Sequence, residues 1–527
     1  MKSPAALAFA LLLLTGWAGT AFAVELTRGP YLQNASDRAI TVRWRTDVAT
    51  DSRVWVGAAP GTWIPAATDP TVTTEHEVRL TGLTPDTRYF YAVGSSAGRL
   101  PGADSTYRFV TPPVPGTVTR ARIWVLGDPG TSSGGQARVR DAYLEWTGER
   151  ETNLCLLLGD NAYESGTDAE FQDALFEPFA SFLRGTCAWA VRGNHDDAHE
   201  GPYNDFEELF TFPTAGEAGG VASSTEDWYA FDYGDVHFVA LDSQDADRDP
   251  GSPMLTWLAA DLAATTRTWV IVFFHHPPYS KGSHDSDDDE RMTEMRENVM
   301  PILEAFGVDL VLTGHSHAYE RSYLLDGHYG TSDTFESSMR LDAGDGDALG
   351  DGDYRKPQHS PGPHEGEVVV VAGAASTLAG GALDHPAMVR SIEALGSVVV
   401  DVEGSLLQAV YLDDQGAIRD RFGIRKGAVV DSGTGSEALR LAAPNPVRTG
   451  RVDFRYALPR PGHASLVLVD AAGRRVRTIA LEAPGAGTHV ATWDGLDTGG
   501  RPAAAGAYFA VLHFEGARRV ARFVVVP

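Results

Sequence analysis

Five short motifs in the middle of the chain combine carboxylate, amide and imidazole side chains at the ends of apolar runs. They are Gly127–Gly130 (GDPG), Gly159–Tyr163 (GDNAY), Gly193–Asp196 (GNHD), Phe273–Pro277 (FFHHP) and Gly314–His317 (GHSH). One such motif alone is more often a cap or a turn than a ligand set. Together, oxygen and nitrogen donors without thiolate suit two borderline-to-hard metal ions. Such a pair clamps the attacking and leaving oxygens of an in-line displacement, which is the chemistry that the motifs predict.

The apolar runs before these motifs predict the elements that must position them. Each run is short enough for a buried strand. The runs are Ala121–Leu126, Leu154–Leu158, Trp189–Val191, Val270–Phe274 and Leu310–Leu312. Polar groups just past the carboxyl ends of such strands are typical of ligand sites in open α/β sheets. Met292–Phe306 predicts one helix between strands, and residues 326–366, rich in Gly, Asp, Ser and His, predict a long surface insertion.

The blocks on either side of this region alternate like strands. Ahead of it, Ile40–Trp44, Val54–Val56 and Val78–Leu80 have a period of two, and Tyr89 is the candidate for a tyrosine corner. After it, the stretch Leu466–Asp470 predicts a strand of a β-hairpin. The last block carries 11 arginines against six acidic residues, whereas the whole chain has a net charge of -28. This asymmetry indicates a separate C-terminal domain.

Composition and the N-terminal residues limit the class of protein. A chain of 527 residues with 43% hydrophobic and 22% charged residues is globular and long enough for about three domains. The acidic charge argues against nucleic-acid binding through a basic face. Residues 1–23 predict a secretory signal cleaved after Ala23 rather than a retained membrane anchor, and no later apolar stretch reaches spanning length. The cysteines, Cys155 and Cys187, leave a disulfide and two buried thiols open.

The five motifs, in this order, resemble those of the metallophosphoesterase superfamily and specifically of the purple acid phosphatases. The resemblance rests on Gly-Asp-x-x-Tyr at Gly159, on GHSHAYERS from Gly314, on RGPYLQ at Arg28 and on the closing segment Asp420–Lys426. It covers about residues 24 to 427. It implies a binuclear centre that pairs Fe³⁺ with a divalent ion, which is Zn, Mn or Fe.

The same resemblance implies the ligands of both ions. The ferric ion would bind Asp128, Asp160, Tyr163 and His317. The divalent ion would bind Asp160, Asn194, His275 and His315, so that Asp160 bridges the pair. His195 and His284 match histidines that contact the phosphate or the leaving group. His276 has no clear counterpart as a ligand, which favours packing or support for it.

The final residues resemble the Ig-like module of flagellar hook-capping proteins through Ala443–Pro446 and Tyr508–His513. We therefore expect a multidomain chain: a central α/β metallophosphoesterase β-sandwich flanked by two all-β Ig- or fibronectin-like sandwiches. The expected parts are a signal peptide (1–23), a fibronectin type III-like domain (24–112), the catalytic domain (117–427), a linker (428–440) and the Ig-like domain (441–527).

The resemblance implies a secreted acid phosphatase, located in the periplasm, outside the cell or on its surface. It would hydrolyse phosphomonoesters, small phosphate esters, by in-line attack of metal-bound hydroxide. Two alternatives remain open: a phosphodiesterase or nucleotidase with the same metal core, and a catalytically weak surface binding protein. The last domain would contact secretion machinery or the cell surface, or serve as a spacer.

Overall fold

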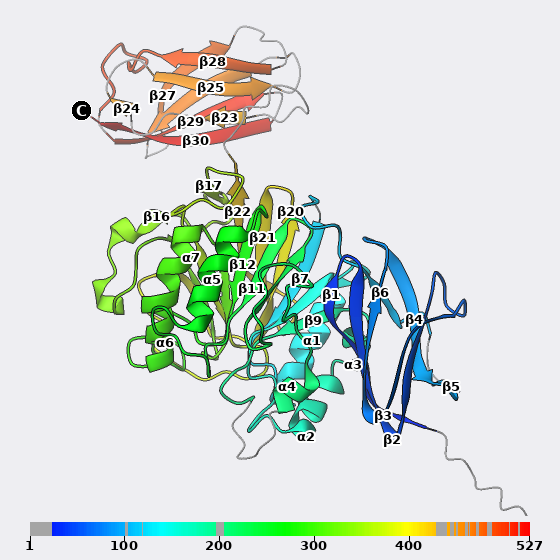
Figure 1. The fold of residues 1–527 in the computed structure, drawn as a ribbon. Helices are drawn as coiled ribbons and strands as arrows, with labels where there is room; N and C mark the ends of the chain where they lie inside the picture. Colours follow the sequence, from blue (N-terminus) through cyan, green and yellow to red (C-terminus); the bar gives the residue numbers. More distant parts are fainter. Residues whose placement is uncertain are drawn as a thin grey trace, which may run out of the picture. The chain divides into compact units, whose positions relative to one another are not determined.

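The computed structural model describes residues 24–427, apart from 101–103, 119 and 197–204, and most of 440–526. The gaps in the second range are 443–446, 449–451, 459–461, 463, 471–473, 482–486, 505 and 515–516. Contacts divide the chain into two compact units, residues 1–428 and 429–527 (Figure 1). The predicted signal peptide and all of the predicted linker except Arg440 lie outside the described residues. None of the described helices combines the length and apolar character needed to cross a membrane.

The N-terminal strands form around one long strand. Their bounds are β1 Leu26–Ser36, β2 Ala39–Gly57, β3 Ile64–Thr81, β4 Arg88–Ser95, β5 Gly98–Arg99 and β6 Arg108–Val110. β2 pairs antiparallel with β1, β3 and β4. The strands predicted at Ile40–Trp44 and Val54–Val56 are therefore one strand. Its register against β3 shifts between Arg45 and Thr50, so the irregularity that suggested a break is a bulge within the strand.

A tyrosine corner stabilises the turn before β4. The hydroxyl of Tyr89 accepts a hydrogen bond from the backbone N–H of Thr84 at 3.0 Å. The ring of Tyr89 also stacks on Phe109 of β6, with 5.5 Å between centroids. This contact confirms the corner predicted from the sequence.

The N-terminal strands continue into the first central sheet through a parallel pair at Leu32 of β1 and Cys187 of β9. This sheet has 13 strands in all, in the order β17-β22-β21-β20-β7-β8-β9-β1-β2-β4-β5, with β3 and β6 beside β2 and β4. Its central members are β7 Arg120–Leu126, β8 Leu154–Leu157, β9 Cys187–Ala190, β17 Tyr354–Lys356, β20 Gly396–Glu403, β21 Leu406–Asp413 and β22 Ile418–Lys426. β7, β8 and β9 are parallel.

The second central sheet has seven strands in the order β10-β11-β12-β13-β18-β14-β19. Its members are β10 Tyr229–Tyr233, β11 Val236–Ala240, β12 Trp269–Phe273, β13 Leu310–Thr313, β14 Tyr319–Ser322, β18 Val368–Ala372 and β19 Met388–Ile392. β11, β12, β13 and β18 are parallel. Side chains of both sheets, among them Trp124, Phe231 and Phe273, share one buried core, so the predicted sandwich architecture is confirmed.

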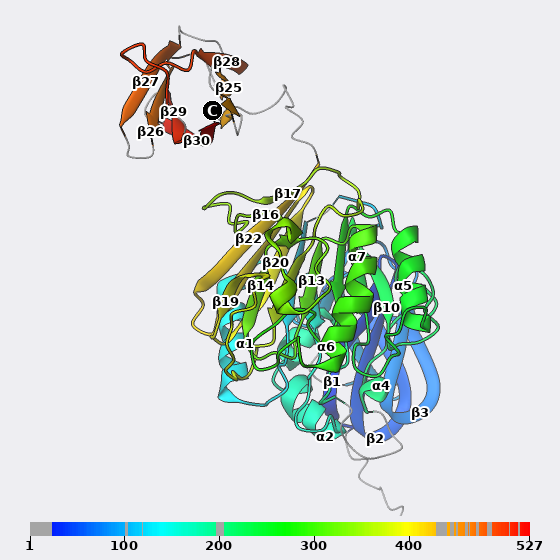
Figure 2. The ribbon, with the colours of Figure 1, turned by 90° about the vertical axis from the view of Figure 1, so that its left-hand side faces the viewer.

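Helices cover the outer faces of the sandwich (Figure 2). They are α1 Gly134–Thr147, α2 Asp168–Phe171, α3 Ala180–Leu183, α4 Asp205–Leu209, α5 Pro253–Ala264, α6 Glu290–Glu294 and α7 Met300–Phe306. Leu258 of α5 and Met300 of α7 share a buried cluster with Val272 and Val311 of the second sheet. The predicted helix over Met292–Phe306 begins earlier, and a π-helical turn at Met295–Val299 interrupts its α-helical geometry.

The segment 326–366 is only partly the surface insertion that its composition predicts. Asp347 to Gly350 lie in turns on the surface, and short β15 Leu324–Leu325 pairs with β16 Arg340–Asp342. β17 instead joins the edge of the first central sheet, where it is parallel to β22. Composition missed this strand because Lys356, a polar residue, is its buried anchor, with its ammonium 2.7 Å from Asp309.

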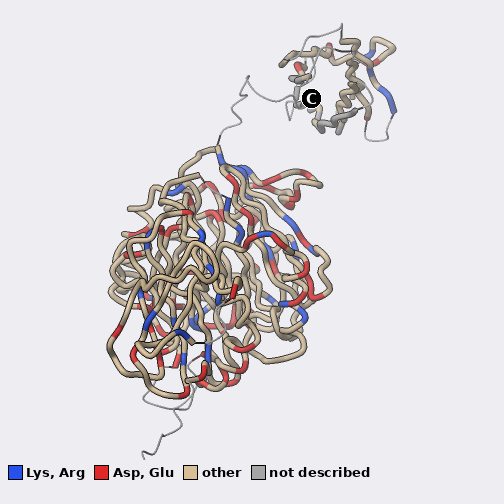
Figure 3. Tube along the Cα trace, turned by 90° about the vertical axis from the view of Figure 1, so that its right-hand side faces the viewer, with Lys and Arg blue, Asp and Glu red and all other residues tan. Residues whose placement is uncertain are grey.

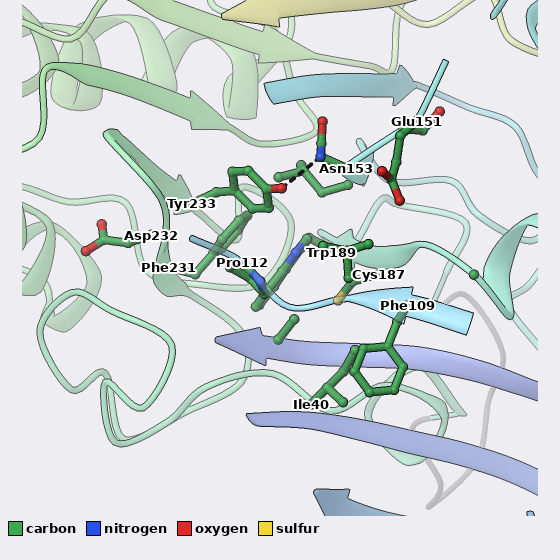
Figure 4. A pocket seen from close by; sticks show the side chains of 15 residues that line it. Ile40, Phe109, Pro112, Glu151, Asn153, Cys187, Trp189, Phe231, Asp232 and Tyr233 are labelled. Carbon is green, nitrogen blue, oxygen red and sulfur yellow. Dashed lines mark hydrogen bonds between the residues drawn. The ribbon is translucent and has the colours of Figure 1, made fainter. Parts of the chain in front are cut away.

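The two cysteines are free and buried. The parallel register sets Cys155 beside Ala188 and Cys187 beside Leu154, so the two side chains point to opposite faces of the sheet. The thiol of Cys187 lines a pocket of about 20 Å³, which Phe109 and Trp189 also line (Figure 4). None of the predicted ligands lines this pocket. The structure therefore contains two buried thiols rather than a disulfide between Cys155 and Cys187.

The second unit is an all-β sandwich. Its three-stranded sheet contains β23 Arg440–Ala442, β25 Val452–Leu458 and β28 Gly487–Trp493. Its five-stranded sheet contains β24 Val447–Arg448, β26 Ala464–Asp470, β27 Arg475–Leu481, β29 Gly506–Phe514 and β30 Ala517–Val526. Phe454, Leu466, Trp493 and Phe523 form its core. The hairpin predicted around Leu466–Asp470 is β26 with its antiparallel partner β27.

Candidate metal centre

The predicted ligands lie where parallel strands of both central sheets end. They follow β7 (Asp128), β8 (Asp160, Tyr163), β9 (Asn194), β12 (His275) and β13 (His315, His317). The carboxyl ends of these strands meet at one edge of the sandwich, and the side chains there form two groups of donor atoms. This edge is where open α/β sheets place their ligands.

The first group, here the tyrosine set, is centred on the hydroxyl of Tyr163. This oxygen lies 2.9 Å from Oδ2 of Asp160, 3.1 Å from Nε2 of His317 and 3.3 Å from Oδ1 of Asp128. Nε2 of His317 lies 3.4 Å from Oδ1 of Asp128. The four donor atoms therefore surround one point.

The second group, here the asparagine set, is centred on the side-chain oxygen of Asn194. This Oδ1 lies 3.0 Å from Nε2 of His275 and 3.0 Å from Nδ1 of His315. The two nitrogens are 3.2 Å apart, and Nε2 of His275 is 3.5 Å from Oδ1 of Asp160. Asp160 thus contributes one carboxylate oxygen to each set.

Both sets have the spacing that a bound ion requires. An ion about 2.1 Å from each ligand holds neighbouring ligands about 3.0 to 3.4 Å apart in octahedral or tetrahedral geometry. The ring of His275 bonds through Nδ1 to the carbonyl of Leu158 at 2.8 Å, so its neutral Nε2 carries a lone pair. This lone pair faces another acceptor, the oxygen of Asn194. A cation must lie between these two acceptors, either a proton on Nε2 of His275 or a metal ion, and the spacing of both sets suits a metal pair.

The local electric field also fits cations. Although burial lowers it, the carboxylates of Asp160 and Asp128 raise the pKa of His275 overall. Burial together with the same carboxylates raises the pKa of Tyr163. A phenolate at Tyr163 therefore requires added positive charge beside it, as a metal ion would supply.

His315 is held neutral and oriented for binding. Burial lowers its pKa to about 3, so its imidazole keeps a free lone pair at neutral and mildly acidic pH. Its Nε2 has no hydrogen-bond partner among the described residues, and Oδ2 of Asp289 lies 3.9 Å away. Asp289 itself caps α6 by accepting from the N–H of Met292. This carboxylate lies on the far side of the His315 ring from Asn194 and supports its orientation.

Three of the ligand residues have backbone angles that side chains rarely adopt. The φ angles are 58° at Asp128, 51° at Asp160 and 66° at His315. Each such conformation destabilises the fold by about 1–3 kcal/mol, which contacts with the surrounding residues must offset. Next to them, a Cβ at Gly193 would lie 2.2 Å from Oδ1 of Asp160, so only glycine allows this approach.

Both predicted substrate histidines lie beside the donor sets. The ring of His195 lies 4.3 Å from that of Tyr163, and its Nδ1 bonds to the carbonyl of Glu164 at 2.8 Å. The exposed ring of His284 stacks on His315 with 3.9 Å between centroids. The two rings thus flank the tyrosine set and the asparagine set respectively.

Two further residues brace the site. The buried carboxylate of Asp196 accepts hydrogen bonds from the N–H groups of Asn161 (2.7 Å), Ala162 (3.1 Å) and Gly193 (2.9 Å). It thereby ties the loop after β8 to the loop after β9. The sequence contained Asp196 in a motif, but spacing alone gave it no role. His276 is buried against His315, with Nδ1 2.9 Å from the hydroxyl of Ser243, as expected for a supporting residue.

The segment after the last predicted ligand, β14, is hydrogen-bonded to the first sheet. Tyr319 and Arg321 of β14 donate to the carboxylate of Asp420 on β22, at 2.8 Å from the phenol and 2.6 and 3.0 Å from the guanidinium. All three side chains are buried. These two parts of the recognised pattern therefore join the second sheet to the first.

Three known domain families match this chain. Residues 29–111 match the purple acid phosphatase N-terminal domain, residues 121–319 the calcineurin-like phosphoesterases, and residues 447–513 the FlgD Ig-like domain. Purple acid phosphatase 18 of Arabidopsis thaliana is 28% identical over 314 residues, which are 55% of this chain and 65% of the relative. Purple acid phosphatase 1 of Ipomoea batatas is 26% identical over 47% of this chain and 51% of the relative. The chain thus spans about half to two thirds of the length of such relatives.

Solved structures share the fold. Purple acid phosphatase PPD1 from Lupinus luteus aligns with a TM-score of 0.58 at 18% identity, over 78% of each chain. A structure of PhoD aligns with a TM-score of 0.54 at 13% identity, over 75% of this chain and 90% of that one. The purple acid phosphatase family implies a binuclear metal centre, which agrees with the two donor sets. Successive parts of the chain are therefore similar to the purple acid phosphatase N-terminal domain, to the calcineurin-like phosphoesterases and to the FlgD Ig-like domain.

Proposed function

We propose that this protein is a two-metal phosphatase that hydrolyses phosphomonoesters. One observation carries the proposal: Asp160 offers one oxygen to the tyrosine set and the other to the asparagine set. Two bound cations supply an activated water and offset the charge that builds on the phosphoryl oxygens. The seven residues of the two sets would hold these ions.

Two histidines take the roles of substrate binding and proton transfer. His195 and His284 flank the donor sets, so a phosphoryl group bound there lies within reach of both rings. His195 presents Nε2 to the site because its Nδ1 is engaged by Glu164. One of the two rings stabilises or protonates the departing alkoxide.

The donor atoms favour different ions at the two positions. The tyrosine set offers a phenol and two carboxylates, hard donors that select Fe³⁺. The asparagine set offers two imidazoles with two oxygens, which suit Zn²⁺, Mn²⁺ or Fe²⁺. A phenolate bound to iron gives a visible charge-transfer band, so the purified protein should be coloured.

We further propose export and a surface role for the last domain. Residues 1–23 have the pattern of a secretory signal. Acidic and basic residues are interspersed along the Cα trace of the described residues (Figure 3), and the net charge of -28 argues against nucleic-acid binding. The C-terminal domain matches an FlgD Ig-like domain and would contact secretion machinery or the cell surface.

The decisive experiment measures metal content and turnover together. The purified protein should hold two metal equivalents in the two donor sets and hydrolyse a chromogenic monoester faster than the matching diester. Faster turnover of the diester would reassign the substrate class. Two bound metals without turnover of either ester would support a binding protein instead.

A further inference from the structure

A second group of metal-type ligands lies at the opposite edge of the second sheet. Glu304 of α7, Asp326 and His364 each offer one donor atom within 4.8 Å of the others. Nδ1 of His364 is 2.9 Å from Oδ1 of Asp326. Part of the cluster faces solvent, because 57% of the His364 side chain is exposed, whereas Glu304 is buried.

Polar groups hold the carboxylate of Glu304 in place. Both of its oxygens accept from the N–H of Gly327 at 2.9 Å, and the hydroxyl of Tyr329 donates to Oε2. The N–H of His364 bonds to the main-chain carbonyl of Glu304 at 2.9 Å. The helix end and the two loops are thus fixed around the donor atoms.

A buried carboxylate behind the cluster is the independent sign of a ligand. Glu367 is fully buried, and neither of its oxygens meets a hydrogen-bond donor among the described residues. Its backbone pairs with Leu325, next to Asp326, at 2.9 and 3.0 Å. Burial, followed by the charge of Glu304, raises the pKa of Glu367, which places the two carboxylates in one another's field.

The charge of Lys356 acts on Glu367 from a distance, without an ion pair between them. Within the described residues, no lysine or arginine forms an ion pair with Glu304, Asp326 or Glu367. The ammonium of Lys356 is engaged by Asp309 at 2.7 Å. Buried carboxylates are normally paired or coordinated to a metal, so a bound cation would stabilise this group.

We propose that Glu304, Asp326 and His364 bind a divalent cation, whose charge would also offset that of the buried carboxylate of Glu367. Two carboxylates with one imidazole suit a borderline ion such as Zn²⁺. Glu367 and Asp309 precede β18 and β13, whereas His315 follows β13. A strand of this length spans about 13 Å, so the third site is separate from the catalytic pair and independent of the proposed function.

The test counts metal ions in the full-length holoenzyme. With catalytic metals in place, Zn²⁺ alone is added in excess at pH 7.5, and bound metal per chain is measured after gel filtration. We expect one equivalent more in the wild type than in Asp326→Asn or His364→Ala, with monoester turnover unchanged. His359→Ala, an exposed histidine of the same insertion, is the matched control and should keep the extra equivalent.

A second readout guards against a variant that folds poorly. Added Zn²⁺ should raise the melting temperature of the wild type and of His359→Ala by roughly 2 °C, and leave His364→Ala unchanged. His364 is exposed, so its removal is compatible with the fold. Equal metal content in wild type and both variants, with equal melting shifts, would overturn the site. It would indicate that the carboxylates share protons instead.

Discussion

Two buried carboxylates of the central sandwich, Asp160 at the carboxyl edge and Asp309 at the amino edge, have opposite surroundings. At the carboxyl edge, Asp160 and Asn194 lie beside the imidazole of His275, and no lysine or arginine of the described residues forms an ion pair with Asp160. At the amino edge, the carboxylate of Asp309 lies between two ammonium groups, 2.7 Å from Lys356 and 2.6 Å from Lys426. Complete pairing indicates a structural role, and its absence indicates a site for ligands.

The largest expected effect is at the carboxyl edge. Asp160→Asn should lower monoester turnover by at least about 10³-fold, because it weakens both donor sets at once. Metal content should fall below two equivalents, while the circular dichroism spectrum stays that of the wild type. Asp173→Asn, at an exposed aspartate of the π-helical turn Gln172–Phe176, is the control. Retained hydrolysis in Asp160→Asn would contradict the assignment of the bridge.

The next largest effect is expected when one of the two lysines that pair with Asp309 is removed. Lys426→Met leaves Asp309 with one cation and should lower the free energy of unfolding by about 3–5 kcal/mol, measured by denaturant titration. Turnover per folded molecule should not change. Arg120→Gln breaks a surface pair with Glu403 and should cost no more than about 1 kcal/mol. Equal losses in both variants would remove the contrast between paired core and exposed surface.

The pH dependence of the free energy of unfolding tests another fully partnered buried charge, that of His237. His237 is buried between Asp232 and Asp261, at 2.8 and 2.7 Å, and these carboxylates outweigh burial and raise its pKa to about 9. Because the folded pKa exceeds the unfolded value of 6.5, its contribution is complete below pH 6.5 and is lost as pH rises through 9. Stability should fall by about 3 kcal/mol over this interval, and His237→Asn should abolish the slope. A wild-type profile that stays flat from pH 6.5 to 9.5 would contradict this.

The smallest effect concerns the phenol. Tyr163→Phe keeps the other three donors of its set, so turnover should fall only about tenfold. The visible absorption band should disappear from the spectrum of the purified variant. A band that survives unchanged would show that Tyr163 is not bound to iron.

The sequence predicted the donors better than the way they are held. The resemblance to the purple acid phosphatases named the seven residues, and the strand ends predicted that their motifs meet, because parallel strands deliver their carboxyl ends to one edge. The positive φ angles at Asp128 and His315 could not be foreseen, since they arise from packing between loops that are distant in sequence. Asp196 bonds to Asn161 and Ala162, which lie 35 and 34 residues earlier in the chain. Asp289 lies 26 residues before His315, so neither contact could be read from local spacing.

The strand predictions failed where tertiary contacts outweighed local pattern. β17 was hidden in a polar stretch because its anchor, Lys356, is a charged residue that is buried only once Asp309 is beside it. β2 looked like two strands because its bulge near Thr50 interrupts the alternation without ending the pairing. In both cases the deciding partner lies far away along the chain.

The pairing of β1 with β9 gives the N-terminal domain a second task. By lying against β9, it shields hydrogen-bonding groups that would otherwise form an open sheet edge. β9 leads directly into Asn194, so fraying of that edge would reach the metal ligands within four residues. A truncated enzyme starting at residue 117 should therefore self-associate and lose activity even though every ligand is still encoded. The N-terminal domain thus protects the edge of β9, the strand that leads to Asn194.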